Sequence, residues 1–155
     1  MYIVEMNEKN IMEAAECYSN SWKSTHSALF SEEFVNAFTA EKVMGILKKD
    51  EASDRITFIA YDKNTAIGLV TIDKNLCEMT HLYVKPDRVR QGVGTKLMEF
   101  AIKQLTSINR VYVTVISENH DAVDFFEHYS FEFTGEQRTL KNGLLELRYV
   151  YKKKK

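Results

Sequence analysis

The chain has little cysteine and no long apolar run, and each shortage excludes a class of protein. Its 155 residues include only two cysteines, Cys17 and Cys77, which are isolated and lack metal-site or redox spacing, so no disulfide scaffold and no zinc site is indicated. No apolar run approaches membrane-spanning length, and the N-terminus is typical of a strand rather than a secretory signal. We therefore expect buried reduced thiols, no bound metal, no membrane partner and a cytoplasmic location.

The chain also lacks a strong charge of either sign. Its formal net charge is −1, but four lysines occupy residues 152–155, which leaves 17 of the 21 basic residues against 22 acidic ones, a net −5 for the body. An acidic body disfavours a nucleic-acid binder, which presents a basic face. With 45% hydrophobic residues, one proline and no internal repeat, we expect a single globular domain over residues 1–151 and a basic, disordered tail over residues 152–155.

The most informative segment that is present is a glycine-containing turn between an apolar strand and an amphipathic helix, within residues 84–98. Gly92 and Gly94 let a ligand approach the backbone closely, and the amides of a helix's first turn can donate to an anion. The spacing does not fit a P-loop, and Leu97 stands where a dinucleotide fingerprint needs a third glycine or alanine. The segment therefore predicts an anion cradle of another kind.

Hydrophobic periodicity predicts an alternation of strands and helices along the chain. Strands are predicted at residues 2–6, 55–61, 66–73, 76–85, 111–116, 131–140 and 144–151. Helices are predicted at residues 9–24, at 31–49 with a break or bend near Phe38 and Thr39, from the glycine turn to about residue 106, and at 121–129. The strand at 111–116 is apolar on both sides, which predicts burial at the centre of the sheet. Periodicity alone thus indicates an α/β domain with one layer of sheet and helices.

Three motifs in this order resemble the GNAT superfamily of N-acetyltransferases. The glycine turn is similar to the family's acyl-CoA loop, Gln/Arg-x-x-Gly-x-Gly/Ala, and residues 77–86 are similar to its preceding strand, which often reads Glu-Leu-x-x-Leu-Tyr-Val-x-Pro. Residues 119–131 resemble the family's Asn-x-x-Ala-x-x-Phe-Tyr-Glu-Lys-x-Gly-Phe without a gap, and residues 21–34 faintly resemble the entry helices of one subgroup. The resemblance implies the GNAT acyl-CoA N-acyltransferase fold, a mixed, mostly antiparallel sheet flanked by helices.

The resemblance also implies acetyl-CoA as the acyl donor and no metal. The amides of the glycine turn would hold the pyrophosphate, and the preceding strand would donate an amide to the thioester carbonyl. Asn119 would reach the pantetheine arm, although asparagine is also an ordinary helix cap. The expected cofactor-binding residues are Leu82, Tyr83, Val84, Val89, Arg90, Gln91, Gly92, Val93, Gly94, Thr95, Asn119 and Phe126.

Transfer to an amine requires a base, because an alkylamine with a pKa near 10.4 is mostly protonated at neutral pH. Glu78 lies where some family members place a carboxylate that acts through water, and His81 is the second candidate because imidazoles titrate near neutrality. Strict alternation puts the two side chains on opposite faces of their strand unless the strand bulges between them. A solvated or cation-paired Glu78 without a catalytic role is the alternative.

The general acid is where the chain departs most clearly from the family pattern. Phe126 stands where many members have the tyrosine that protonates the leaving thiolate. Either the thiolate leaves unassisted or another hydroxyl serves, and Tyr129, one helical turn away, is that candidate, with a core aromatic as the alternative. Ser130 replaces the glycine that usually ends this helix in a left-handed conformation, and Val89 replaces the loop's Gln or Arg.

Trp22, His26 and Phe30 are the expected acceptor-binding residues. Trp22 and His26 are four apart on one helix face near the family's acceptor cleft, and core packing is the alternative for Trp22 and for Phe30. We expect an N-acetyltransferase that moves the acetyl group of acetyl-CoA to a primary amine of a small molecule or peptide, by direct attack in a ternary complex. The sequence does not decide whether the protein forms a homodimer. The alternative function is a non-catalytic acyl-CoA-binding sensor or interaction module.

Overall fold

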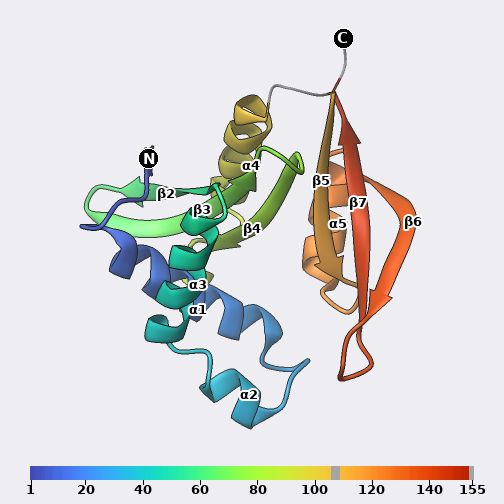
Figure 1. Ribbon diagram of the computed structural model, residues 1–155, viewed down its shortest axis with the longest axis horizontal. Helices are drawn as coiled ribbons and strands as arrows, with labels where there is room; N and C mark the ends of the chain where they lie inside the picture. Colours follow the sequence, from blue (N-terminus) through green and yellow to red (C-terminus); the bar gives the residue numbers. More distant parts are fainter. Residues whose placement is uncertain (106–108, 154–155) are drawn as a thin grey trace.

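The fold is a seven-stranded sheet with helices on both faces (Figure 1). The computed structural model describes residues 1–105 and 109–153. The strands are β1 (Tyr2–Glu5), β2 (Arg55–Asp62), β3 (Thr65–Asp73), β4 (Glu78–Val84), β5 (Arg110–Ile116), β6 (Glu132–Thr139) and β7 (Leu145–Lys152). They lie in the order β1-β2-β3-β4-β5-β7-β6, and all neighbours are antiparallel except β4 and β5. The mixed, mostly antiparallel sheet expected from the sequence is confirmed.

The helices are α1 (Ile11–His26), α2 (Glu32–Asn36), α3 (Ala40–Ala52), α4 (Val93–Gln104) and α5 (His120–His128), with a 3₁₀ turn, η1, at Pro86–Arg88. The break or bend predicted near Phe38 and Thr39 is a complete break between α2 and α3. Thr39 has an extended backbone, and its side chain accepts a hydrogen bond from the Lys42 amide at 3.2 Å. An N-cap of this kind starts a new helix rather than continuing the previous one.

Two hydrophobic cores lie on opposite faces of the sheet. On one face α1 and α3 cover strands β1 to β4, and fully buried residues there include Ala15, Val43, Leu47, Ile59 and Leu69. On the other face α4 and α5 cover β3, β4 and β5, where Leu97, Ala101, Val111 and Phe131 are buried. Both cysteines are buried, as the sequence predicted.

The two halves of the sheet separate between β4 and β5. These strands pair only at Glu78 with Tyr112 and at Met79 with Val113, and Figure 1 shows them diverging beyond that point. The prediction that β5 is buried on both sides is wrong, because Thr114 is exposed. The helices α1 and α3 cover β1 to β4 instead, so this side of β5 faces the opening that the divergence creates.

The ends of the chain differ slightly from the predicted boundaries. β7 reaches Lys152, one residue beyond the expected end of the domain, and the Lys153 amide donates to the Asn109 carbonyl at 2.6 Å. The last two tail lysines and the predicted helix end at residue 106 lie outside the described residues. Across residues 1–105 and 109–153, none of the helices combines the length and the apolar character needed to cross a membrane.

Candidate active site

A β-bulge in β4 brings the two candidate bases onto one face of the strand. Asp73 of β3 pairs with Glu78 and Thr71 pairs with His81, so Thr80 is an extra residue between the paired positions. Asp73 and Thr71 are two apart on a regular strand and share a face, and their partners therefore share it too. The sequence allowed this arrangement only with a bulge at this place, and the bulge is present.

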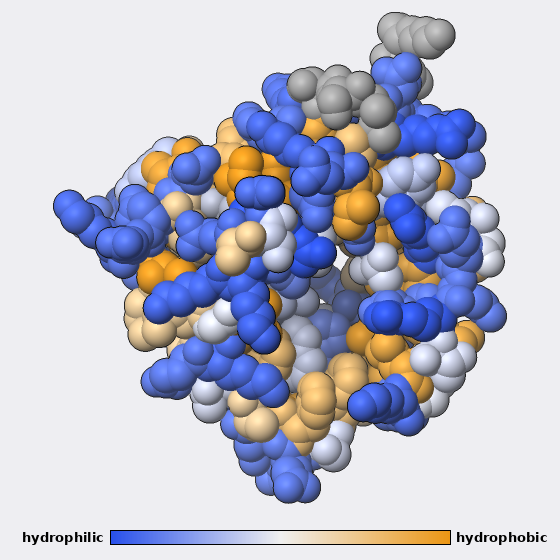
Figure 2. Space-filling model, viewed as in Figure 1, coloured by the Kyte–Doolittle hydropathy of each residue, from blue (hydrophilic) through white to orange (hydrophobic). Residues whose placement is uncertain are grey.

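Glu78 and His81 line a cleft of about 640 Å³ at the divergence of β4 and β5. Figure 2, in the view of Figure 1, shows the surface hollowed there. Trp22 and His26 from α1 line the same cleft, whereas Phe30 contacts Trp22 with ring centroids 5.4 Å apart and is not one of its lining residues among those described. The remaining lining residues come from α1, β2, β4, β5, the start of α5 and the β6–β7 hairpin: Tyr18, Arg55, Met79, Thr80, Leu82, Tyr83, Val113, Thr114, Val115, Ile116, Asn119, Ala122, Phe126, Arg138 and Glu146.

Glu78 is half-buried on the α1 side of the sheet. Burial raises the pKa of its carboxyl above the ordinary value, although the positive charges of Arg148 and Arg55 and a hydrogen bond with Thr114 oppose the rise. A carboxyl with a raised pKa holds a proton more readily, which suits a general base. Because the two arginines act on Glu78, the alternative that Glu78 only pairs with a cation is also consistent with the structure. The catalytic role of Glu78 stays a prediction.

His81 is held by hydrogen bonds at both ring nitrogens. Its Nε2 lies 3.0 Å from Oδ2 of Asp50, and its Nδ1 lies 3.2 Å from the Tyr18 hydroxyl. Asp50, 5% exposed, also accepts from Arg55 at 3.0 Å, and Arg55 donates to Asp73 at 3.1 Å. Burial opposes ionisation of Asp50, but the bonds from His81 and Arg55 outweigh it and hold the pKa of Asp50 below its usual value.

Sequence reasoning did not find Tyr18 or Asp50 as site residues. Asp50 lies 31 positions from His81 and no local spacing joins them, while Tyr18 belongs to the apolar stripe of its helix and is indistinguishable there from a core residue. Their contacts with His81 depend on how α1 and α3 pack on the sheet. Only the tertiary structure reveals them.

The glycine turn has the open geometry that a pyrophosphate requires. Gly92 precedes α4 with a left-handed φ of +84°, and a Cβ added there would meet nothing within 4 Å. The Lys96 amide donates to the Gly92 carbonyl at 3.1 Å, so the amides of Val93, Gly94 and Thr95 come before this first helical bond. These donors at a helix N-terminus fit an anionic ligand, and the residues present fit coenzyme A.

The backbone of β4 offers further donors to the gap. The Lys85 amide donates to the Ile67 carbonyl of β3 at 2.8 Å. Because successive amides along a strand point to opposite edges, the Tyr83 amide also points toward β3, and the amides of Leu82 and Val84 point toward the diverging β5. The predicted amide for the thioester carbonyl is therefore available from Leu82 or Val84, and any contact of Tyr83 with a ligand is left to its side chain.

The aromatic residues of α5 divide between the cleft and the glycine turn. Phe126, 6% exposed, lines the cleft without a hydroxyl. The Tyr129 hydroxyl lies 2.7 Å from the Thr95 hydroxyl on α4, so it meets the glycine turn rather than the lining residues of the cleft. Asn119 lines the cleft and also caps α5, its side chain accepting from the Ala122 amide at 3.3 Å. The proposed roles of these three residues stay predictions.

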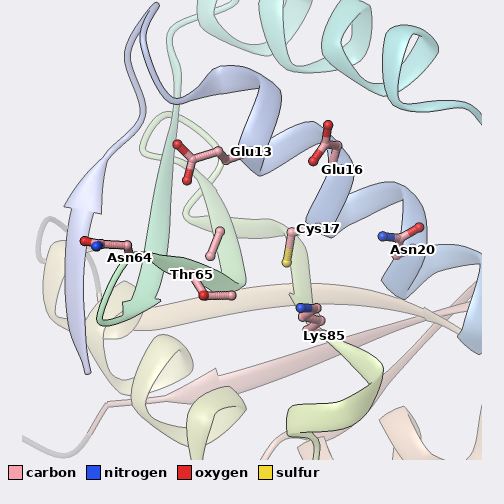
Figure 3. A pocket seen from close by; sticks show the side chains of 8 residues that line it. Glu13, Glu16, Cys17, Asn20, Asn64, Thr65 and Lys85 are labelled. Carbon is pink, nitrogen blue, oxygen red and sulfur yellow. The ribbon is translucent and has the colours of Figure 1, made fainter.

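A second pocket of about 360 Å³ lies away from these motifs, between α1 and the β2–β3 hairpin. Figure 3 shows Glu13 and Glu16 on α1, with Cys17 directed toward Lys85. Burial raises the pKa of the Cys17 thiol to about 11, so this sulfur is protonated at neutral pH and is a poor nucleophile. We place the candidate active site in the larger cleft for this reason.

The sequence model of the acetyltransferase (GNAT) domain matches residues 13–153, which is most of the chain. The chain belongs to the GNAT acetyltransferase family. Two solved structures share the fold of this GNAT domain. The PaiA N-acetyltransferase of Thermoplasma acidophilum in complex with coenzyme A has a TM-score of 0.75 and 20% identity, over 97% of this chain and 100% of that one. A GCN5-related N-acetyltransferase from Rhodopseudomonas palustris has a TM-score of 0.79 and 18% identity, over 97% and 94%.

Two curated proteins are similar in sequence. The spermidine N(1)-acetyltransferase of Thermoplasma acidophilum is 23% identical over 142 residues, covering 86% of this chain and 88% of that protein. The UPF0157 protein YqkA of Bacillus subtilis is 28% identical over 110 residues, covering 69% of this chain. The chain matches only 32% of the length of the Bacillus protein.

Proposed function

We propose that this GNAT domain transfers the acetyl group of acetyl-CoA to a primary amine, by direct attack of the amine on the thioester in a ternary complex. One observation carries the proposal: β4 carries Glu78 and His81 in the cleft where it diverges from β5, and the same strand leads directly to the glycine turn at its end. A donor held at the turn and an acceptor in the cleft would therefore meet at this strand.

The residues support a balanced transfer. The amides of Val93, Gly94 and Thr95 would hold the pyrophosphate, and those of Leu82 and Val84 would donate to the thioester oxygen, where negative charge grows. A new C–N bond forms, the C–S bond breaks, and the amine's proton passes to the Glu78 carboxylate directly or through water. A thiolate whose conjugate acid has a pKa near 8.5 can leave unassisted, which is consistent with Phe126.

We propose a cationic amine, with polyamines as the first class to test, as the acceptor. Trp22 lines the cleft, and aromatic rings attract cations. The cleft's two arginines are each paired: Arg55 with Asp50 and Asp73, and Arg138 with Glu146 at 2.7 Å. Carboxylates thereby offset the charges of both arginines that line the cleft, and Arg148 is the other positive charge that acts on Glu78. The related protein named for spermidine is the second reason for this choice.

An amine panel tests the proposed function. Release of free thiol from acetyl-CoA is measured with spermidine, a lysine peptide blocked at its N-terminus, a peptide with a free N-terminus and an aminoglycoside, each beside its N-acetylated form as control. Thermal unfolding with and without CoA is measured in parallel. We expect CoA to stabilise the protein and at least one free amine to release thiol. Stabilisation without turnover would favour the sensor function, which the absence of a tyrosine hydroxyl at Phe126 suggests. Absence of stabilisation by CoA would overturn both functions.

A further inference from the structure

The hydrogen bonds of His81 restrict what this side chain can do in the cleft. An ionised carboxylate only accepts, so the bond to Asp50 requires a proton on Nε2 of His81. In the neutral ring Nδ1 is then the acceptor, and its partner is the Tyr18 hydroxyl at 3.2 Å. Both nitrogens of the neutral imidazole are therefore engaged, and a substrate amine would reach His81 only through Tyr18.

We propose that Tyr18 is the cleft end of a proton relay in which its phenol accepts a proton from the acceptor amine while passing its own proton to Nδ1 of His81. The relay rests on the proposed function and names how its acceptor loses a proton. An alkylammonium acceptor loses two protons over the transfer: the relay takes the one that must leave before the nitrogen attacks, and Glu78 takes the one released as the C–N bond forms. Tyr18 stays neutral, and His81 becomes an imidazolium beside the Asp50 carboxylate. Tyr18 is thus a catalytic residue, and Asp50 is a positioning residue that acts through His81.

The surroundings of Tyr18 favour a shuttle over a phenolate base. Tyr18 lines the cleft but is only 4% exposed, and burial raises the pKa of its hydroxyl well above the ordinary range. A buried phenolate would be costly, whereas a concerted exchange of protons leaves no charge on the ring. The ring packs against Tyr83 and Phe38, with centroids 4.5 and 5.8 Å away. The Tyr18 hydroxyl therefore has two side-chain partners, Nδ1 of His81 and the Tyr83 hydroxyl.

Charged groups around His81 come from several elements. Tyr18 approaches from α1 and Asp50 from α3, while Glu78 shares its strand face. Arg55 of β2 acts at one remove, because it anchors Asp50 and is itself anchored by Asp73 of β3. The imidazolium formed by the relay therefore lies next to the Asp50 carboxylate, and the Arg55 guanidinium on the far side of Asp50 is also paired with Asp73.

Nitrogen chemical shifts of the imidazole test the relay without any substrate. The protein contains four histidines, and the signals of His81 are those lost from the ¹⁵N-labelled protein in the variant His81→Gln. We expect neutral His81 to be the tautomer with its proton on Nε2, and Asp50→Asn to weaken that preference. A neutral His81 protonated at Nδ1 would overturn the relay, because Nδ1 could not then accept from Tyr18.

Kinetics with acetyl-CoA and the amine that gives turnover test the catalytic role. Tyr18→Phe is compared with Tyr149→Phe, because Tyr149 is also 4% exposed and its hydroxyl also donates one bond at 3.2 Å, to Glu127. We expect kcat to fall about 10²-fold in Tyr18→Phe with KM for acetyl-CoA unchanged, and to stay the same in the control. An unchanged kcat in Tyr18→Phe would overturn the relay.

The positioning role of Asp50 has its own signature. The relay delivers a proton to Nδ1 of His81, so this nitrogen must be unprotonated at the start of the transfer. Asp50→Asn removes the carboxylate that stabilises the imidazolium, and we expect the acidic limb of the pH–rate profile to move to lower pH, with partial reversal in Asp50→Glu. A lowered rate with the limb in place would overturn this role. If no amine is turned over, the proposed function and the relay's catalytic role both fail, while the nitrogen shifts still decide whether the hydrogen-bonded chain exists.

Discussion

Glu78 combines two properties that oppose each other in a folded protein. Its carboxyl is half-buried, which disfavours the charged form, yet the base that an amine acceptor needs is that charged form. A group whose pKa is raised in the folded state contributes stability that is present below its unfolded pKa and is lost as pH rises through the folded pKa. Glu78 at neutral pH therefore favours chemistry at the expense of stability.

Replacing Glu78 by glutamine should separate these effects. We expect Glu78→Gln to lower kcat about 10²-fold at neutral pH while the free energy of unfolding rises at pH 7 and not at pH 3. Steady-state kinetics and urea unfolding at the two pH values measure this. Glu132→Gln, an exposed carboxylate on β6, is the control and should change neither quantity. A Glu78→Gln protein with unchanged kcat between pH 6 and 9 would remove Glu78 from the mechanism.

A pair of buried threonines gives a second prediction at this scale. The hydroxyls of Thr57 and Thr71 lie 2.7 Å apart, with exposures of 2% and 0%. Thr57→Val leaves one buried hydroxyl without this partner and should cost about 1–3 kcal/mol. The double variant Thr57→Val, Thr71→Val should cost less than the single one, because both polar groups are then gone. Urea unfolding of the four proteins in the cycle checks this, and simple additivity of the two losses would contradict it.

At the scale of elements, one departure from the family pattern lies at a helix end, where Ser130 replaces a glycine after α5. Ser130 follows α5 with a left-handed φ of 71°, the conformation that the glycine of the family pattern would adopt without strain. Gly92 begins α4 with φ +84° and retains its glycine. Arg90, two residues before Gly92, is also left-handed with φ 63°. The protein therefore accepts left-handed strain at non-glycine residues both in the glycine turn and at the exposed end of α5.

Ser130→Gly should stabilise the protein. Left-handed strain of about 1–2 kcal/mol exceeds the extra unfolded-chain entropy of glycine, about 0.4–1 kcal/mol, so we expect the free energy of unfolding to rise by about 1 kcal/mol. Ser27→Gly is the matched control, since Ser27 is also exposed and follows a helix but has a right-handed φ of −58°. That substitution should destabilise, and the idea fails if both variants shift the urea midpoint in the same direction.

The divergence of β4 and β5 organises the whole molecule, because it leaves a sheet that only two residue pairs close. Coenzyme A bound there would supply acceptors to amides that have lost a strand partner. At about 100 times its dissociation constant, a ligand of the native state adds about 2.7 kcal/mol of stability. The gain should be concentrated where the strands diverge.

Hydrogen exchange with and without CoA locates this gain. We expect added protection at the amides of Leu82, Val84 and Gly94, which face the gap or precede the first bond of α4. The Tyr83 amide points toward β3 and serves as an internal control that should not change. Protection of Tyr83 in equal measure with Leu82 would indicate general tightening instead of binding at the gap.

Local sequence patterns predicted the helices and strands, whereas the hydrogen bonds of the site join residues that are far apart in the sequence. Periodicity located every strand and helix to within a few residues, including the break that Thr39 makes between α2 and α3. It misjudged β5, because Thr114 and Ile116 on one side of this strand line the cleft, and Tyr112 on the same side lies under the Arg148 guanidinium. The hydrogen-bond partner of His81 is Asp50 on α3. No local spacing in the sequence predicts how this helix packs against β4.

Thr80 shows that this site depends on chain length as well as on residue chemistry. The residue is an insertion in a strand that would otherwise alternate regularly, and bulges bend a strand and increase its twist. Deleting Thr80 would leave Glu78 and His81 on the same side of β4 while straightening the strand toward β5. Such a deletion would keep each functional group and remove the local bend of β4, so we expect it to narrow the cleft without changing the chemistry of its lining.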